Sequence, residues 1–362
     1  IISIFSVTLL ASVSRNDSNN YALRQAEAII IGYLGAFVFT KINYQVVAKK
    51  WYITAGICLA LLVYTIIFGE AVEGSDGVNA KAWIKLPGGT QFQPSELAKV
   101  GFIITFSQHL NHIKKNGYIK EFKHILFLAL HALVPIGLTH LQGDDGAAVI
   151  FFFMFLTMAF AAGIQLRYFG IILAAICILI PLAWNLNILT EYQKKRFLIQ
   201  FDLESDPGEY GFQQIQGRTS IGSGQLWGRG LFNGIRVGSG SVPIAQSDFI
   251  FSVVGEELGF LGCLLVIALI TGLIFTALYI AKCSCDDLGK YMCFGFIGLV
   301  MFQTIFNLGM CLTVLPVMGV TLPFFSAGGS SAACLYFALG LIQNVYMNRD
   351  NKDLVILNEM ES

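Results

Sequence analysis

The sequence predicts an all-α integral membrane protein, and three observations support this fold class. Of the 362 residues, 55% are hydrophobic, only 13% are charged, and 30 are phenylalanine. Soluble domains carry about 25% charged residues, so this much apolar surface needs lipid around it. Because unpaired backbone groups are costly in lipid, segments that cross it are expected to be helices. The formal net charge of zero gives no indication of nucleic-acid binding.

Hydropathy along the chain indicates ten spans. The first, Ile1–Val13, is shorter than the roughly 20 residues that a span needs. We interpret it as the remainder of a truncated helix, since no charged segment precedes it as in a signal peptide. The whole chain, residues 1–362, shows no internal repeat and is expected to be a single polytopic domain. The other nine spans are expected at Leu23–Ile42, Trp51–Phe68, Ser95–Leu110, Ile125–Leu141, Ala147–Ala162, Tyr168–Leu189, Phe249–Ile280, Tyr291–Leu312 and Ala332–Met347.

Basic residues between the spans predict the orientation. With a cytoplasmic N-terminus, twelve Lys or Arg fall in inside segments, and only four (Arg15, Arg24, Lys81 and Lys85) fall in short outside loops. The positive-inside rule therefore places both termini, including the tail 348–362, in the cytoplasm. Residues 190–247, between the seventh and eighth spans, become a large extracellular loop. A loop of that length is usually functional or disordered.

The cysteines and histidines predict neither a disulfide framework nor a metal site. None of the eight cysteines falls in the extended outside loops. Cys283 and Cys285 lack the second ligand pair that zinc would need. His109 and His112 lack a third ligand and are interpreted as interfacial polar residues.

Polar residues inside or beside the membrane are functional candidates, because each costs free energy unless it is paired or hydrated. In QPSELAK, Pro94 and Ser95 suit the start of a helix. Glu96 and Lys99 then follow at i and i+3, close enough to pair. This ion pair either locks two helices together or serves a site.

Other signals allow a structural and a functional interpretation. Asp144 and Asp145 form a solvated turn or an acidic site. The cationic run Lys194–Arg196 contacts lipid phosphates non-specifically or holds a diphosphate. The glycines of GFQQIQGRTSIGSGQLWGRG and the small residues of TLPFFSAGGSSAA let backbone approach a ligand, or give loop mobility and close helix contacts.

Three carboxylates stand near the start of the eighth span, in QSDFIFSVVGEELG. Asp248 is expected in the first turn of that helix, where an anion can act as a cap or serve chemistry. Glu256 and Glu257 lie about 12 Å deeper and are expected to bind a basic group or polar backbone. Asp248 also begins a stripe at helical spacing with Ser252, Gly255 and Gly259, and this stripe is expected to line a cavity.

Six motifs, in order, resemble the signatures of the SEDS family, which includes RodA, FtsW and SpoVE. They are QPSELAK, QGDDGAA, YQKKR, GFQQIQ with IGSG and GRG, SDFIFSVVGEELG, and LPFFSAGGSS, within a resemblance that extends from Gln25 to Tyr346. The resemblance implies a ten-helix peptidoglycan glycosyltransferase of the bacterial cytoplasmic membrane. It would polymerise lipid II, a disaccharide peptide on undecaprenyl diphosphate, on the outer face during elongation or division. It also implies a class B penicillin-binding protein as partner.

The resemblance assigns roles residue by residue. Asp248 matches the acid regarded as essential in the family and is expected to be catalytic. The residues expected to bind substrate are Trp83, Gln93, Ser95, Glu96, Lys99, Asp144, Arg196, Gln213, Gln216, Ser326, Gly328, Gly329 and Ser330.

The chain departs from the family pattern at two places. Gly143 and Asp145 stand where Pro and Leu are usual, which adds a charge to that turn. Ile244, Gln246 and Ser247 replace the common Glu, His and Thr ahead of the catalytic acid. A mechanism that needs that Glu or His therefore does not transfer to this chain.

The implied chemistry needs few groups. A carboxylate such as Asp248 can take the proton of a sugar 4-hydroxyl that displaces the diphosphate, with one inversion. The leaving diphosphate needs cations, supplied by Arg196 and its neighbours, by Lys99, or by a bound Mg²⁺ or Mn²⁺. Two other functions stay open at this stage, a lipid II flippase or transporter and a non-catalytic scaffold for a cell-wall synthase.

Overall fold

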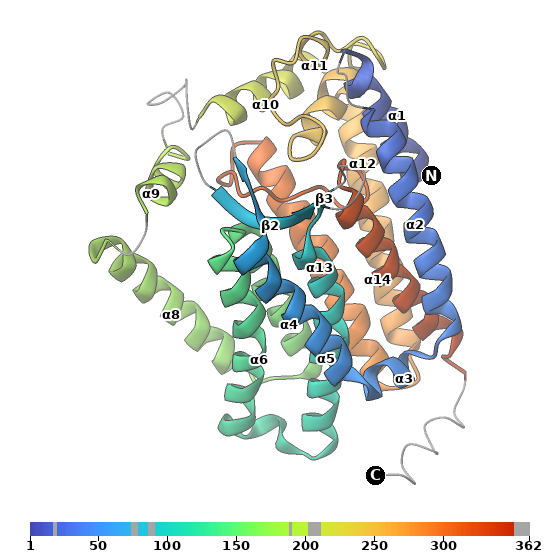
Figure 1. The fold of residues 1–362 in the computed structure, drawn as a ribbon, viewed down its shortest axis with the longest axis vertical. Coiled ribbons are helices and arrows are strands. Elements are labelled where there is room, and N and C mark those ends of the chain that lie inside the picture. The colour runs from blue at the N-terminus through green and yellow to red at the C-terminus, as the bar shows by residue number, and fades with distance from the viewer. Residues whose placement is uncertain (17–19, 74–78, 86–90, 188–189, 202–210, 351–362) are drawn as a thin grey trace.

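The computed structural model describes residues 1–16, 20–73, 79–85, 91–187, 190–201 and 211–350. The long helices run roughly parallel, and a small sheet and the short helices of residues 211–247 lie toward one end of the bundle, here called the sheet end (Figure 1). The helices are α1 (Ile2–Val13), α2 (Tyr21–Lys41), α3 (Tyr44–Lys49), α4 (Trp51–Phe68), α5 (Pro94–Lys115), α6 (Phe122–Leu141), α7 (Asp145–Ala162), α8 (Leu166–Asn185), α9 (Glu191–Leu198), α10 (Phe212–Ser223), α11 (Ile235–Gly238), α12 (Ile250–Cys283), α13 (Asp287–Cys311) and α14 (Gly329–Met347).

Seven described helices are long and apolar enough to cross a membrane, namely α2, α4, α6, α7, α8, α12 and α13. Of the other expected spans, α1 is a shorter apolar helix. Helices α5 and α14 carry more polar residues, and both lie inside the bundle, where most of their side chains are buried against protein. Polar residues on such central helices meet other side chains rather than lipid.

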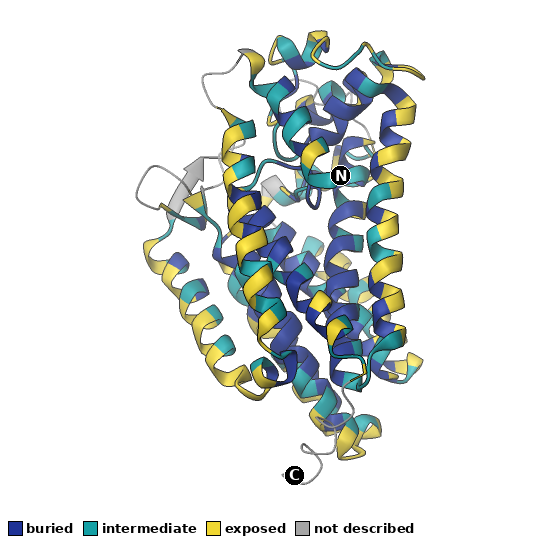
Figure 2. Ribbon diagram, turned by 90° about the vertical axis from the view of Figure 1, so that its right-hand side faces the viewer, coloured by how far each residue is buried: buried dark blue, intermediate teal, exposed yellow. Residues whose placement is uncertain are grey.

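The outward faces of the helices are apolar. Figure 2 shows exposed positions along the outer sides of the bundle and buried positions between the helices. On α2, for example, Ile30, Leu34 and Phe37 are each at least 60% exposed. A water-soluble protein rarely exposes so continuous an apolar surface, so this surface fits a lipid environment.

The prediction of an all-α fold is wrong between α4 and α5. This segment forms an antiparallel sheet of three strands in the order β1 (Glu70–Glu73), β2 (Asn79–Lys85) and β3 (Gln91–Phe92). The Lys81 N–H donates to the Gln142 carbonyl at 2.9 Å, and the Gln142 side chain donates to the Leu62 carbonyl at 2.8 Å. The sheet is thereby tied to the α6–α7 turn and to α4.

The described part of residues 190–247 contains three helices rather than one open loop. Helix α9 begins with a capping box, in which Thr190 and Gln193 bond each other's backbone N–H groups. Helix α10 packs on α12. Part of this segment, residues 202–210, lies outside the described residues, as do residues 351–362 of the expected tail.

Helix α12 is broken at Gly259, although the sequence predicts one continuous span. Gly259 has φ 66° and ψ −162°, a conformation open to glycine and little else. The Phe260 N–H donates to the Gln225 carbonyl at 2.8 Å, and the Arg229 N–H donates to the Glu256 carbonyl at 2.9 Å. The segment after α10 thus satisfies backbone groups freed at the break.

Helix α8 stands apart from the rest of the bundle (Figure 1). Tyr168 is its only buried residue, and its contacts with other elements are sparse. Its apolar side chains therefore border open space on more than one side.

Candidate active site

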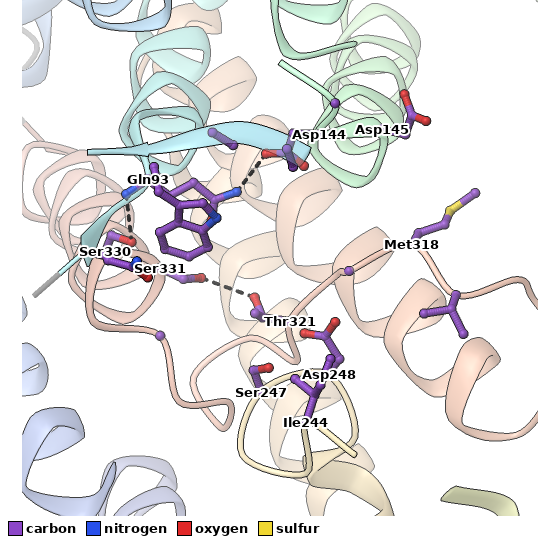
Figure 3. Close-up of a pocket in the computed structure, with 18 of the residues that line it drawn as sticks. Gln93, Asp144, Asp145, Ile244, Ser247, Asp248, Met318, Thr321, Ser330 and Ser331 are labelled. Atoms are coloured by element: carbon purple, nitrogen blue, oxygen red, sulfur yellow. Dashed lines mark hydrogen bonds between the residues drawn. The ribbon is translucent and has the colours of Figure 1, made fainter. Parts of the chain in front are cut away.

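A cavity of about 1830 Å³ opens among the sheet, the α6–α7 turn, α8, α9 and the segments that precede α12 and α14. Figure 3 shows its polar part, where Gln93 and Asp144 lie on one side and Ser247 and Asp248 on the other. These groups come from three segments that are distant in the sequence. The fold therefore gathers several of the sequence motifs around one space.

Asp248 does not lie in the first turn of α12. The helix begins at Ile250 with Phe249 as its N-cap, no side chain caps it, and its first turn holds no acid. The half-buried Asp248 lines the cavity from the turn that precedes the helix. The prediction of a first-turn position is therefore wrong, and Asp248 does not cap the helix.

The predicted stripe along α12 does not line the cavity either. Ser252 is fully buried, and a Cβ at Gly255 would lie 2.9 Å from the Ile221 Cα of α10. Only Asp248 of the predicted stripe lines the cavity. The small residues instead let α10 and the following segment pack closely against α12.

The backbone around Asp248 is held by hydrogen bonds from two other segments. The Asn307 side chain of α13 donates to the Asp248 carbonyl at 2.8 Å and to the Val320 carbonyl at 2.8 Å. The Ser326 hydroxyl donates to the Ser247 carbonyl at 2.5 Å. These bonds fix the acid relative to α13 and to the segment that leads into α14.

The pKa of Asp248 is raised above its ordinary value. Burial away from bulk water is the main cause, and the nearby charge of Asp144 adds to it. A hydrogen bond from Ser247 and the charge of Arg196 act in the opposite direction. A carboxylate with a raised pKa is a better proton acceptor than an ordinary aspartate once it is ionised.

Asp144 is held at the N-terminus of α7. Its Oδ1 caps the helix by accepting from the Ala147 N–H at 2.9 Å. Its Oδ2 accepts from the Gln93 side chain at 2.7 Å and from the Ser95 hydroxyl at 3.0 Å. The backbone N–H of Gln93 donates to the Ser330 hydroxyl at 3.3 Å, which links this group to α14 (Figure 3).

Of the predicted cations, Arg196 alone lines the cavity. Its guanidinium donates to the Val317 carbonyl at 2.9 Å. Lys194 turns away and donates to the Asn187 side chain at 2.7 Å. Lys99 and Glu96 form a buried ion pair at 2.8 Å. Neither residue lines the cavity, although both charges act on Cys334, which does line it.

The other predicted substrate residues divide into two groups. Ser326 is buried under the cavity floor, where it also accepts from the Leu322 N–H. Gln216 lies outside the cavity lining and accepts from the Arg236 guanidinium. Those that line the cavity are Trp83, Gln93, Asp144, Gln213, Gly328, Gly329 and Ser330.

Glu256 and Glu257 bind backbone, as one of the two sequence alternatives predicts. Glu256 accepts from the Arg236 N–H at 2.8 Å and from the Ser220 hydroxyl at 2.8 Å. Glu257 accepts from the Ser12 hydroxyl at 2.5 Å and from a backbone N–H ahead of α11. Both carboxylates stabilise the packing of neighbouring segments at the sheet end, and we assign neither of them a part in the chemistry.

Sequence reasoning missed three polar groups of the site. Asn307 is fully buried and holds the Asp248 backbone. Thr321 and Ser331 bond each other at 3.3 Å and line the cavity between Asp248 and Ser330 (Figure 3). Asn307 could have been found as a lone amide in an apolar span, since such residues are functional candidates.

The described residues contain no group of three His, Cys, Asp or Glu that could hold a metal ion. Both oxygens of Asp144 are already engaged by protein donors. Of the two acids from the sequence motifs that were expected in the site, Asp248 is therefore the one better placed to touch a ligand.

The chain matches a known family along nearly its whole length. The family model described as a cell cycle protein of the FtsW, RodA and SpoVE type covers residues 1–351. The chain belongs to this family. Its several apolar helices, together with this family, indicate a multi-pass membrane protein.

Two curated relatives carry enzyme names. A probable peptidoglycan glycosyltransferase FtsW from Geobacter metallireducens is 32% identical over 350 residues, which is 95% of this chain and 90% of the relative. The peptidoglycan glycosyltransferase MrdB of Escherichia coli K12 is 32% identical over 293 residues, covering 81% and 76%.

Solved structures of the FtsW/RodA/SpoVE type share the fold. One is described as showing structural coordination of polymerization and crosslinking by a peptidoglycan synthase complex. It has a TM-score of 0.80 and 29% identity, and covers 96% of this chain and 95% of its own. The crystal structure of Thermus thermophilus RodA has a TM-score of 0.70 and 27% identity, covering 96% and 94%.

Proposed function

We propose that this chain is a peptidoglycan glycosyltransferase that polymerises lipid II into glycan strands. The observation that carries the proposal is the position of Asp248, a half-buried carboxylate with a raised pKa on the wall of a large cavity. The enzyme names of the FtsW and MrdB relatives support the reaction class.

The reaction needs a proton acceptor at the attacking hydroxyl. The 4-hydroxyl oxygen of the acceptor sugar forms a bond to C1 of the donor sugar, and the bond from C1 to the diphosphate oxygen breaks. Asp248 takes the hydroxyl proton, and the diphosphate leaves with the electron pair. Because the donor is α-linked and the polymer β-linked, a single displacement with inversion suffices.

Arg196 is the cation best placed for the leaving diphosphate. It lines the cavity and its charge acts on Asp248. A guanidinium presents several donors in a plane that suits phosphate oxygens. Lys99 does not share this role, because its charge is already paired with Glu96 away from the cavity.

An apolar wall extends from the polar part of the cavity along α8. Ile176, Leu179 and Ile180 line it, with Phe152 of α7 and Phe337 of α14. Such a wall suits the isoprenoid chain of lipid II, which can exchange lipid contacts for packing against these apolar side chains. The lipid would enter sideways, between helices.

We place the chain in the bacterial cytoplasmic membrane as one polytopic domain with ten spans and both termini cytoplasmic. The excess of basic residues in the inside segments supports this orientation. The sheet end, residues 190–247 and the cavity then face outward, where lipid-linked sugar is polymerised. Helices α5, α14 and α1, together with the seven apolar helices, make up the ten proposed spans.

A class B penicillin-binding protein is the proposed partner. Its support is a related structure described as a synthase complex that coordinates polymerization and crosslinking. A transpeptidase held at the outer face could crosslink each strand as it leaves the cavity.

The purified chain with its penicillin-binding partner, given fluorescent lipid II, tests the proposal. Glycan ladders on a gel are the expected result. Movement of lipid II across vesicles without ladders would favour a flippase. Neither activity from a folded complex would favour a scaffold. The charged and polar groups gather at one end of the cavity, which favours a reaction site over an alternating-access pathway.

The pH profile of polymerisation should report on Asp248. Because its pKa is raised, kcat/KM should fall with decreasing pH through a value above the ordinary aspartate pKa of about 3.9. Removing the charge of Arg196 with Arg196→Gln should move this limb to higher pH. Asp144→Asn should move it to lower pH, because a like charge is lost.

The control for this profile is Glu121→Gln. Glu121 lies at the other end of α6, about 30 Å along the helix axis from the cavity. The acidic limb of the pH profile of Glu121→Gln should coincide with that of wild type. A wild-type acidic limb at the ordinary aspartate pKa would contradict the assignment of this limb to Asp248. Acidic limbs of Arg196→Gln and Asp144→Asn that do not move in opposite directions would also contradict it.

Asn307→Ala should weaken both the fold and the reaction. It removes the amide that donates to the Asp248 and Val320 carbonyls and leaves the Asp248 carbonyl with the weaker thiol donor of Cys311, at a cost of about 1–3 kcal/mol of unfolding free energy. Asp248 would also lose its fixed position, so the specific activity of the folded fraction should fall about tenfold or more.

Asn344→Ala is the matched control. Asn344 is equally buried and bonds the Thr40 carbonyl and the Tyr44 N–H at the opposite end of the bundle. It should lower the unfolding temperature to a similar degree and leave the specific activity of folded protein unchanged. Equal activity losses in the two variants would mean that Asn307 acts on stability alone.

A further inference from the structure

Helices α8 (Leu166–Asn185) and α9 (Glu191–Leu198), together called the arm, border the cavity but pack little against the bundle. Five residues of α8 and four positions from 190 to 197 line the cavity. The arm meets the bundle near α9, where Arg196 donates to the Val317 carbonyl and Gln193 donates to Asp145. The position of α9 therefore depends on these polar contacts together with the buried Ile199 and the Gln200 side chain, which donates to the Thr313 carbonyl just after the helix.

One of these contacts uses the acid that departs from the family pattern. The Gln193 side-chain amide donates to Asp145 Oδ2 at 2.9 Å. On the other oxygen, His140 Nδ1 meets Asp145 Oδ1 at 2.6 Å. All three residues line the cavity. Asp145 points away from Asp144 and its partners (Figure 3), so the two adjacent acids serve different contacts.

The contact bears on Arg196 through the geometry of α9. Gln193 and Arg196 are three residues apart on one short helix, so their side chains lie on neighbouring positions of the same face. A bond that fixes Gln193 against the α6–α7 turn therefore also fixes the direction of Arg196. Leucine, which is usual in the family at position 145, has no polar side-chain atom and could not accept this hydrogen bond.

We propose that His140, Asp145 and Gln193 form a latch that holds α9 against the α6–α7 turn and positions Arg196 for the diphosphate of lipid II. The proposal rests on the proposed function for its substrate. His140 orients the Asp145 carboxylate, Asp145 accepts from Gln193, and α9 carries the cation. These are positioning residues, and Arg196 is the group that touches substrate.

Gln193→Glu tests the latch with little other change. A glutamate side chain still accepts from the Thr190 N–H and so keeps the capping box of α9. Toward Asp145, however, it presents a second carboxylate instead of a donor. We expect trypsin to cleave within Lys194–Arg196 about tenfold faster, and KM for lipid II to rise about tenfold with a smaller change in kcat.

The paired exchange Asp145→Asn with Gln193→Glu should restore the latch. The amide at 145 then donates, the carboxylate at 193 accepts, and the remaining amide oxygen still accepts from His140. Cleavage and KM should return to within about twofold of wild type, because the coupled pair is re-formed. Gln165→Glu, at the other end of the arm, should behave as wild type throughout.

The readouts separate the latch from the proposed function. Trypsin cleavage is measured without lipid II, so it tests the latch even if wild type makes no polymer. Wild-type cleavage and KM in Gln193→Glu would overturn the proposal. A paired exchange as impaired as the single variant would also overturn it, because damage without rescue indicates a general disturbance of α9.

Discussion

Asp248→Asn is expected to reduce lipid II polymerisation by about 10²- to 10⁴-fold, the usual contribution of a general base. The amide keeps the size of the side chain and can still accept from Ser247, but it cannot take the hydroxyl proton. Asp248 is neither the N-cap of α12 nor in its first turn. The loss should therefore appear in kcat without unfolding the site.

The same variant should be at least as stable as wild type. Burial raises the pKa of Asp248 in the folded chain, so the ionised form opposes folding. This penalty grows as pH rises above the unfolded-state pKa, and a neutral amide removes it. Thermal unfolding at neutral pH should show an equal or higher midpoint. Because Asn caps a helix about as well as Asp, a capping residue would show no such gain.

The control for charge removal is Asp287→Asn. Asp287 forms a partly exposed ion pair with Lys114 at the opposite end of the bundle, and ladders from this variant should match wild type. Equal ladders from Asp248→Asn and wild type would remove Asp248 from the mechanism. A variant that is inactive because it unfolds would instead assign Asp248 to the fold.

The helices could be predicted because lipid imposes a simple rule on composition. The eighth span was expected from Phe249 and its helix begins at Ile250. The fifth expected span shows the same agreement, since Leu141 is both the predicted and the observed end. Apolar runs flanked by polar residues determine these limits locally, and no distant contact is needed.

Features that depend on distant contacts could not be predicted in the same way. The break at Gly259 requires the segment Gln225–Arg229 to supply backbone partners, and glycine within an apolar span gives no sign of this. The hydrogen bond that ties β2 to the α6–α7 turn likewise depends on Gln142, far along the chain. A short segment with little periodicity does not reveal such a partner.

The candidate site was partly predictable for the same reason. The order of motifs indicated that Gln93, Asp144, Arg196 and Asp248 belong together, and the fold brings all four to one cavity. The sequence could not indicate that Lys99 is buried beside it, because spacing at i and i+3 fits a substrate site and an ion pair equally well. Nor could it indicate that Asn307 holds the acid, a contact across 59 residues.

The buried pair of Glu96 and Lys99 should give the largest loss of stability. Their side chains are only 8% and 2% exposed and meet at 2.8 Å. Lys99→Met leaves an unpaired carboxylate inside the bundle, which should lower the unfolding free energy by about 3–5 kcal/mol. Glu96→Gln leaves an unpaired ammonium and should also destabilise. Thermal unfolding in detergent measures both.

The double variant Glu96→Gln with Lys99→Met distinguishes an ion pair from a substrate site. Replacing both charges removes the unpaired ion, so most of the stability lost in either single variant should return. Neither side chain lines the cavity, so polymerisation should return with it. A double variant that is stable but makes no glycan would show that Lys99 reaches substrate during the reaction. The charges of Glu96 and Lys99 both act on Cys334 in the cavity wall, and this part of the wall would then have to open as lipid II binds.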